Sequence, residues 1–206
     1  MLWQYITDRY KAGEPIIASD IEINISEVYR RQQFKQLTDE GKLKRYENGV
    51  YYIPKKSRLG TEMAILPDDV IECKYISRNK KTFGYYSGFA FANQIGITTQ
   101  MPSVKEIITS EMGNPIKRIE KGNRIFVVRK ARTQITDSNV RVLQFMDLLK
   151  DIEQYSELDG KELTDCLERY IRNFNITKSD MDKYLPLYPD KIYKSIYETG
   201  IINVFA

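Results

Sequence analysis

The sequence contains no histidine among its 206 residues. Histidine is the commonest general base in enzymes and a frequent ligand of transition metals. Its absence excludes Ser-His and Cys-His catalysis and any metal site held by imidazole. Catalysis by carboxylates alone stays open. However, the acidic residues in the last third of the chain alternate with lysine and arginine at helical spacing, which is typical of a solvated helix face. We therefore expect no catalytic residues and no enzymatic activity.

Cysteine pairs and phosphate-binding glycine motifs are missing as well. Cys73 and Cys166 lie far apart and in no Cys-x-x-Cys spacing, so neither a zinc site nor a disulfide framework is indicated. We expect both to be buried thiols. The 11 glycines are scattered and form neither Gly-x-x-x-x-Gly-Lys nor Gly-x-Gly-x-x-Gly. The sequence therefore predicts no metal and no cofactor.

Long apolar runs are also absent. No stretch reaches the roughly 20 predominantly apolar residues that a membrane-spanning helix needs. Residues 1–9 lack the basic head and apolar core of a signal peptide. We expect a cytoplasmic protein that does not associate with membranes.

Positive charge is present but unevenly distributed. The net charge is +4, and residues 1–56 carry 10 basic and 8 acidic side chains, residues 57–136 carry 13 and 7, and residues 137–206 carry 9 and 13. This balance is compatible with nucleic acid as a partner but does not require it. With 42% hydrophobic residues, the chain is long enough for one large or two small domains.

The most informative segment extends from Ser26 to Pro54. Ser26 is a good N-cap for a helix, and Gly41 is a good left-handed stop. Val28, Phe34 and Leu37 are expected to form the apolar side of this helix. Residues 43–46 and 50–53 then have the composition of two strands, and Asn48-Gly49 between them is a strong hairpin signal.

Two shorter helices are expected before this segment, one around Leu2 to Tyr10 and one from Ala18 to Asn24 behind a Ser19 cap. Three helices followed by a hairpin are typical of a winged helix-turn-helix, which we place at residues 1–56. In helix-turn-helix proteins the last helix enters the major groove of DNA. The residues expected to contact double-stranded DNA are Ser26, Tyr29, Arg30, Arg31, Gln32, Lys35, Lys44 and Arg45. The alternative is an ordinary charged helix face.

A second domain is expected over residues 61–206, after a polar segment at 54–60 that we interpret as a linker or a loop. We predict helices after Pro67 and Ser87, and then strands at 104–108, 116–119 and 124–129, with the last two joined by a turn at Lys121-Gly122-Asn123. From about residue 137 the pattern is helical, beginning with a long helix over 140–152. The predicted fold class is α+β, with a winged helix-turn-helix, a mixed α/β domain with a small antiparallel sheet, and a helical C-terminal tail.

The sequence predicts a second basic surface in the strand region of this domain. It consists of Lys117, Arg118, Lys121, Arg124, Arg129, Lys130 and Arg132. Three interpretations stay open, namely additional contact with DNA, a docking surface for an acidic partner, and a solvated face of an antiparallel sheet.

The winged-helix pattern and the segment 87–102 together resemble the AbiEi family of type IV antitoxins and related antitoxin-like regulators. This segment reads Ser-Gly-Phe-Ala-Phe-Ala-Asn-Gln-Ile-Gly-Ile-Thr-Thr-Gln-Met-Pro. The resemblance continues through Gly122-Asn123-Arg124-Ile125 and covers about residues 1 to 150. It implies a bacterial, cytoplasmic antitoxin that binds an inverted repeat in its own promoter. It also implies a nucleotidyltransferase toxin as partner. The acidic helical tail departs from the family pattern.

Three hypotheses follow from the sequence. The first is a DNA-binding transcription regulator of the AbiEi-like type, which represses its own operon and counters a toxin. The second is a protein-interaction module that sequesters a partner without sequence-specific DNA binding. The third is a carboxylate-dependent nuclease, for which no cluster of acids is recognisable in the sequence.

Overall fold

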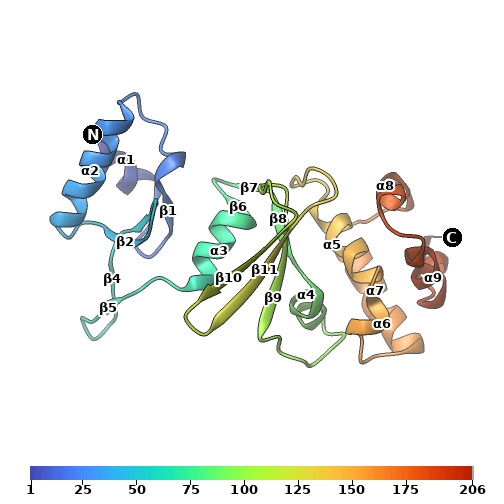
Figure 1. Cartoon of the computed structure of the whole chain (residues 1–206). Coiled ribbons are helices and arrows are strands. Elements are labelled where there is room, and N and C mark those ends of the chain that lie inside the picture. Colours follow the sequence, from blue (N-terminus) through green and yellow to red (C-terminus); the bar gives the residue numbers. More distant parts are fainter. Residues whose placement is uncertain (206) are drawn as a thin grey trace. The chain divides into compact units, whose positions relative to one another are not determined.

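The computed structural model describes residues 1–205 and has an α+β fold. The chain divides into two compact units, the first ending at Cys73 and the second beginning at Lys74 (Figure 1). The first unit extends beyond the boundary that the sequence predicts near residue 56. The reason is that Ile65 and Val70 pack with Val50 and Tyr52 in one apolar cluster. A helix that spans the boundary, α3 (Pro67–Tyr75), begins at the predicted proline.

The first unit combines short helices with a three-stranded antiparallel sheet. Its elements in chain order are α1 (Leu2–Arg9), β1 (Ile16–Ile17), a 3-10 turn η1 (Ala18–Asp20), α2 (Glu27–Asp39), β2 (Lys44–Glu47) and β3 (Val50–Tyr52). The strand order is β1-β3-β2. A second small hairpin, β4 (Lys55–Lys56) with β5 (Glu62–Met63), occupies the segment that the sequence predicts as a loop.

The prediction of a helix from Ala18 to Asn24 is wrong, because only the 3-10 turn η1 forms there. Ile16 and Ile17 pair with β3, and the amide of Ala18 donates a hydrogen bond of 2.9 Å to the carbonyl of Gly49. These bonds hold the chain extended up to the point where the helix was expected to begin. Ser19 makes no capping hydrogen bond.

The second unit is built on a four-stranded sheet in the order β10-β11-β9-β8. The strands are β8 (Gly84–Ser87), β9 (Val104–Thr109), β10 (Ile116–Lys121) and β11 (Arg124–Lys130). The predicted turn at Gly122 is confirmed, and β10 pairs with β11 antiparallel. The sheet is mixed rather than wholly antiparallel, because β11 pairs with β9 in parallel. A further short hairpin joins β6 (Ser77–Arg78) to β7 (Lys81–Thr82).

Helices cover this sheet and form the rest of the unit. They are α4 (Gly88–Ile95), α5 (Val140–Leu149), α6 (Ile152–Tyr155), α7 (Gly160–Asn173), α8 (Lys178–Tyr184) and α9 (Lys191–Glu198), with the 3-10 segments η2 (Leu185–Leu187) and η3 (Ile201–Phe205). Helices α4 and α5 pack on β8, and α4 also packs on β9 (Figure 1). The single helix predicted over 140–152 is interrupted, since α5 ends at Leu149 and α6 begins at Ile152.

None of the helices formed by residues 1–205 combines the length and apolar character needed to cross a bilayer.

Candidate nucleic-acid interface

Helix α2 is positioned by the local signals that the sequence contains. The Oγ of Ser26 accepts a hydrogen bond of 3.2 Å from the amide of Tyr29, which caps the first turn. After the helix, Gly41 has a φ of 70°, in the left-handed region that favours glycine. Phe34 and Leu37 are buried in the core of the first unit. The opposite side of α2 is therefore the side that faces solvent.

The exposed side of α2 presents polar side chains and one unexpected apolar one. Tyr29, Gln32 and Lys35 are exposed, as a DNA-reading face requires. Val28, predicted on the apolar side, is 65% exposed. It lies six residues before Phe34, which places it about 120° away around the helix. The sequence prediction therefore places Val28 on the wrong side of α2, although its spacing from Phe34 already indicates the exposed side.

The two arginines of α2 differ in their environment. Nη1 of Arg30 donates a hydrogen bond of 3.2 Å to the carbonyl oxygen of Ile21, and this side chain is half-buried. Arg31 is exposed and forms an ion pair with Glu27 one turn earlier. Because an exposed pair at this spacing contributes only about 0.3–0.5 kcal/mol, Arg31 can exchange Glu27 for another anion at little cost. Arg30 instead holds the segment before α2 against the helix.

The β2–β3 hairpin carries the other two predicted contacts. At the turn, Nη2 of Arg45 donates to Oδ1 of Asn48 at 2.8 Å, and Gly49 has a φ of 75°. Lys44 forms an ion pair with Glu62 of β5, and the hydrogen bond to that carboxylate raises the pKa of Lys44. Arg45 is thus held at the tip of the hairpin, whereas Lys44 is neutralised by a residue that the sequence prediction did not include.

A cleft of about 340 Å³ separates the beginning of α2 from the β2–β3 turn. It brings Arg30, Arg31 and Arg45 together, from segments fourteen residues apart, and Glu27 is the one acid among its lining residues. Its lining residues are Ala18, Ser19, Glu27, Arg30, Arg31, Phe34, Arg45, Asn48, Gly49 and Tyr51. Ser19 and Asn48 were not among the predicted contacts, although both can donate a hydrogen bond to a phosphate oxygen.

The seven basic residues predicted in the second unit do not share one face of the sheet. Side chains alternate along a strand, and the β10–β11 register therefore separates them. Lys117, Lys121, Arg124 and Lys130 lie on one face, and Arg118 and Arg129 lie on the other.

Several of these seven are also engaged within the unit. Nε of Arg118 lies 3.0 Å from Oε1 of Glu120, and Nε of Arg129 lies 3.3 Å from Oε2 of Glu106. Arg132 follows β11 and donates to the carbonyl of Leu187 at 3.2 Å. These contacts fit a solvated sheet with local ion pairs better than a continuous basic surface.

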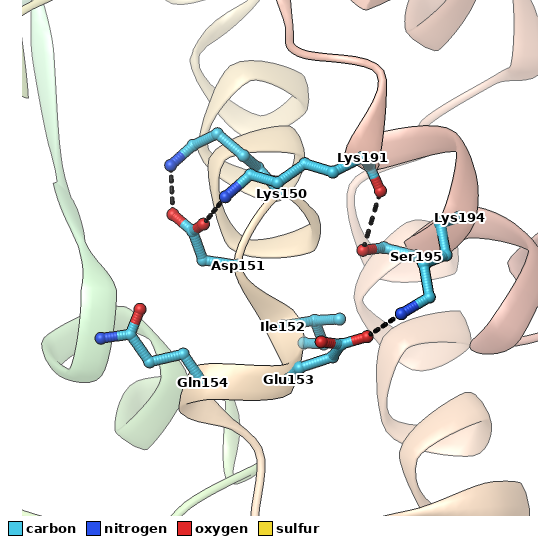
Figure 2. Close-up of a pocket in the computed structure, with 8 residues that line it drawn as sticks. All are labelled: Lys150, Asp151, Ile152, Glu153, Gln154, Lys191, Lys194 and Ser195. Carbon is cyan, nitrogen blue, oxygen red and sulfur yellow. Dashed lines mark hydrogen bonds and ion pairs between the residues drawn. The ribbon is translucent and has the colours of Figure 1, made fainter.

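A polar pocket of about 270 Å³ lies between the α5–α6 turn and α9 (Figure 2). Lys150 and Lys191 both form ion pairs with Asp151, and Nζ of Lys194 lies 2.8 Å from Oε1 of Glu153. Each lysine that lines this pocket thus has a carboxylate partner. We interpret the pocket as an ion-paired clamp that joins α9 to the α5–α6 turn.

Asp147, a buried carboxyl of the second unit, belongs to a structural network. Tyr85 Oη donates to Oδ2 of Asp147 at 2.5 Å, and Tyr188 Oη donates to the carbonyl of Leu143 at 3.1 Å. Burial raises the pKa of Asp147 despite the hydrogen bond from Tyr85. Among residues 1–205, no group of three or more acids and cysteines is arranged to hold a metal ion.

Neither a family model nor a curated protein matches the sequence of this chain. The functional assignment therefore depends on the geometry of α2 and the β2–β3 hairpin.

Proposed function

We propose that the protein is a DNA-binding transcription regulator whose first unit acts as a winged helix-turn-helix. The observation that carries the proposal is the exposed face of α2, with Tyr29, Gln32 and Lys35, immediately followed by a hairpin that holds Arg45 at its tip. A helix with a polar outer face fits the major groove, and a basic hairpin beside it fits the adjacent phosphates.

The chain order of the first unit supports this proposal. A helix, a short strand, the helix α2 and a hairpin follow one another, and β1 pairs with β3. In this arrangement the turn η1 and the segment up to Ser26 take the place of the middle helix. The hydrogen bond from Arg30 to the carbonyl of Ile21 fixes that segment to α2, and we therefore assign Arg30 a positioning role at the edge of the cleft.

We assign different roles to the residues of the interface. Gln32 has an amide that can bond an adenine edge in two places, and Lys35 can pair with a phosphate. Val28 offers the kind of apolar contact that a thymine methyl group accepts. Arg31 and Arg45 flank the cleft and are proposed to contact phosphates, so their contribution decreases with salt.

The wider role follows from the resemblance to AbiEi-like antitoxins. We propose a cytoplasmic bacterial regulator that represses its own operon by binding an inverted repeat. Two copies of the first unit on such a repeat match the two-fold symmetry of the DNA. The second unit is then proposed to counter a nucleotidyltransferase toxin encoded beside it.

One observation favours the second candidate, a protein-interaction module. Val28 and Tyr29 are neighbouring residues on the exposed face of α2, at 65% and 49% exposure. Exposed apolar side chains of this kind also occur at protein interfaces. Lys44 and Arg31 are already paired with acids of the same unit, which lowers the positive charge available to DNA.

Fluorescence anisotropy with labelled DNA from upstream of the gene tests the proposal. We expect a Kd in the range of about 10⁻⁸ to 10⁻¹¹ M for the specific site, with a steep dependence on salt. The double variant K35E/R45E is expected to weaken binding by about a hundredfold, since it replaces two phosphate contacts with repulsion. The matched control is K161E, a charge reversal at an exposed lysine of α7 in the second unit.

Unchanged binding by K35E/R45E, or equal loss in K161E, contradicts the placement of the interface. No binding to upstream DNA together with stable capture of the neighbouring gene's product favours the protein-interaction module. A nucleotidyltransferase in the adjacent reading frame is the expected partner of the antitoxin role.

A further inference from the structure

A groove of about 260 Å³ lies among three helices of the second unit, α4, α5 and α7. Phe91 and Tyr170 are the buried aromatic residues that line it, and Arg141, Arg169 and the carboxamides of Gln94 and Asn173 are exposed around them. All the lining residues belong to one unit, so the groove does not depend on how the two units are arranged.

The charge of this groove differs from that of the surrounding segment. Residues 137–206 carry 9 basic and 13 acidic side chains, but the lining of the groove contains two arginines and no carboxylate. In the ion-paired clamp, by contrast, every lysine is matched by an acid. The groove is therefore a local positive site in an acidic part of the chain, and such a site attracts an anion.

The two arginines are available to a ligand. The guanidinium carbon of Arg141 lies 4.4 Å from the ring centroid of Phe174, and Nη1 donates a long hydrogen bond of 3.5 Å to Oε1 of Gln144. Gln144 and the hydroxyl of Tyr170 engage part of the guanidinium, and its remaining N–H donors are open to a ligand. The side chain of Arg169 is exposed and makes no hydrogen bond or ion pair within residues 1–205. Stacking on Phe174 orients the Arg141 fork, which lowers the entropy lost when it binds an oxyanion.

The remaining lining groups indicate the rest of the ligand. Phe91 and Tyr170 are 1% and 6% exposed and pack against each other edge to face, so the ring of the lining that a planar group can reach is Phe174, at 40% exposure. The carboxamides of Gln94 and Asn173 can each donate to and accept from a polar ring edge. Cys166 also lines the groove, but its thiol donates to the carbonyl of Ile95 and burial raises its pKa. The groove thus offers binding groups without an activated nucleophile.

We propose that the groove formed by α4, α5 and α7 binds a small organic anion that consists of a planar ring and a phosphate or carboxylate group. Arg141 and Arg169 hold the anionic group, the exposed ring of Phe174 packs against the ligand's ring, and Gln94 and Asn173 bond its polar edge. Mononucleotides and aromatic carboxylates share this chemistry. The proposal concerns the second unit alone and stands whether or not the first unit binds DNA.

Isothermal titration calorimetry on the full chain tests the proposal. The probes are the four ribonucleoside 5′-monophosphates, 4-hydroxybenzoate and indole-3-acetate, each titrated to about 1 mM. We expect at least one ring-bearing anion to bind saturably at a ratio near one to one. The matching neutral compound, a nucleoside or an aromatic alcohol, and the ring-free anions phosphate and acetate are expected to bind at least about tenfold more weakly.

Variants of the two arginines test the assigned site. R141Q and R169Q are each expected to weaken binding by about tenfold, because each removes charged hydrogen bonds. The matched control is R172Q, on the same helix α7, where Arg172 pairs with Glu168 and does not line the groove. As a measurement that needs no variant, the side-chain amide signals of Gln94 and Asn173 are expected to shift in NMR spectra of the wild type during titration.

The proposal is overturned if no ring-bearing anion binds, if phosphate alone binds as well as the ring compounds, or if R141Q/R169Q binds like the wild type. It is also overturned if the Gln94 and Asn173 signals stay in place while a ligand binds. Binding of a nucleotide but not of the carboxylates, or the reverse, supports the proposal and identifies the class of ligand.

Discussion

The rings of Phe34 and Tyr51 are stacked, with centroids 4.5 Å apart and planes inclined by 26°. Phe34 belongs to α2 and Tyr51 to β3, so this contact joins the helix directly to the hairpin. Both residues also line the cleft that contains Arg31 and Arg45. The stack therefore fixes the position of the exposed helix face relative to the hairpin tip.

Replacement of Phe34 by alanine is expected to lower the free energy of unfolding of the first unit by about 3–5 kcal/mol, because it removes a buried ring and leaves a cavity. Denaturant unfolding of the full chain, followed by the fluorescence of Trp3 in the same unit, measures the change. Val28→Ala on the exposed side of α2 is the control and is expected to stay within about 0.5 kcal/mol. Equal effects of the two variants would contradict the observed orientation of α2.

The elements that the sequence predicted correctly depend on local chemistry. Ser26 and Gly41 delimit α2 because a cap and a left-handed stop act within a few residues. The Asn48-Gly49 turn is confirmed for the same reason. The ion pair between Glu27 and Arg31 is also local, at a spacing of four residues, and could have been predicted.

The features that the sequence did not reveal depend on distant partners. Arg30 was predicted on the exposed face, but the carbonyl of Ile21 accepts its hydrogen bond from outside the helix. The break between α5 and α6 lies at Asp151, whose ion pair with Lys191 joins residues forty positions apart. The parallel pairing of β9 with β11 likewise arises from the path of the whole chain and not from strand composition.

The two arginines of α2 are expected to respond differently to replacement by glutamine. R30Q removes the hydrogen bond to Ile21 and should lower the free energy of unfolding by about 1.5–3 kcal/mol, as for bonds from charged donors. R31Q breaks only an exposed ion pair and should cost about 0.3–0.5 kcal/mol. If DNA binds as proposed, R31Q also removes one phosphate contact. The slope of log Kd against log salt concentration should then be less steep by about one. R31Q is therefore the control for the stability effect of R30Q, since it removes an arginine of the same helix at little cost in stability.

Gly49 and Gly113 form a matched pair for testing the hairpin turn. Gly49 has a φ of 75°, whereas Gly113 is outside the left-handed region, and a Cβ would meet no atom within 4 Å at either position. Gly49→Ala is expected to cost about 1–2 kcal/mol because an L-residue is strained there. Gly113→Ala is expected to be neutral or slightly stabilising. A neutral Gly49→Ala variant in thermal unfolding would contradict the observed turn conformation.

Asp147 allows the sign of a pH effect to be predicted. Burial raises the pKa of this carboxyl, and the hydrogen bond from Tyr85 and the charges of Lys150 and Arg132 only partly oppose that change. Since the folded state holds the proton more tightly, the unfolded state releases it first as the pH rises. The free energy of unfolding therefore decreases from the unfolded pKa of about 3.9 up to the folded pKa and is then constant.

The variant D147N removes this titration while its amide oxygen can still accept from Tyr85 Oη. We expect D147N to be at least as stable as the wild type at pH 7, and its advantage to shrink as the pH falls below the folded pKa of Asp147. D147L, in contrast, takes the Asp147 acceptor away from the buried hydroxyl of Tyr85 and should lower the free energy of unfolding by about 1–3 kcal/mol. Urea unfolding of the three proteins between pH 3 and pH 8 measures these differences. If the stability advantage of D147N instead grows as the pH falls, Asp147 is stabilised as a carboxylate in the folded protein. The charges of Lys150 and Arg132 would then outweigh the effect of burial on its pKa.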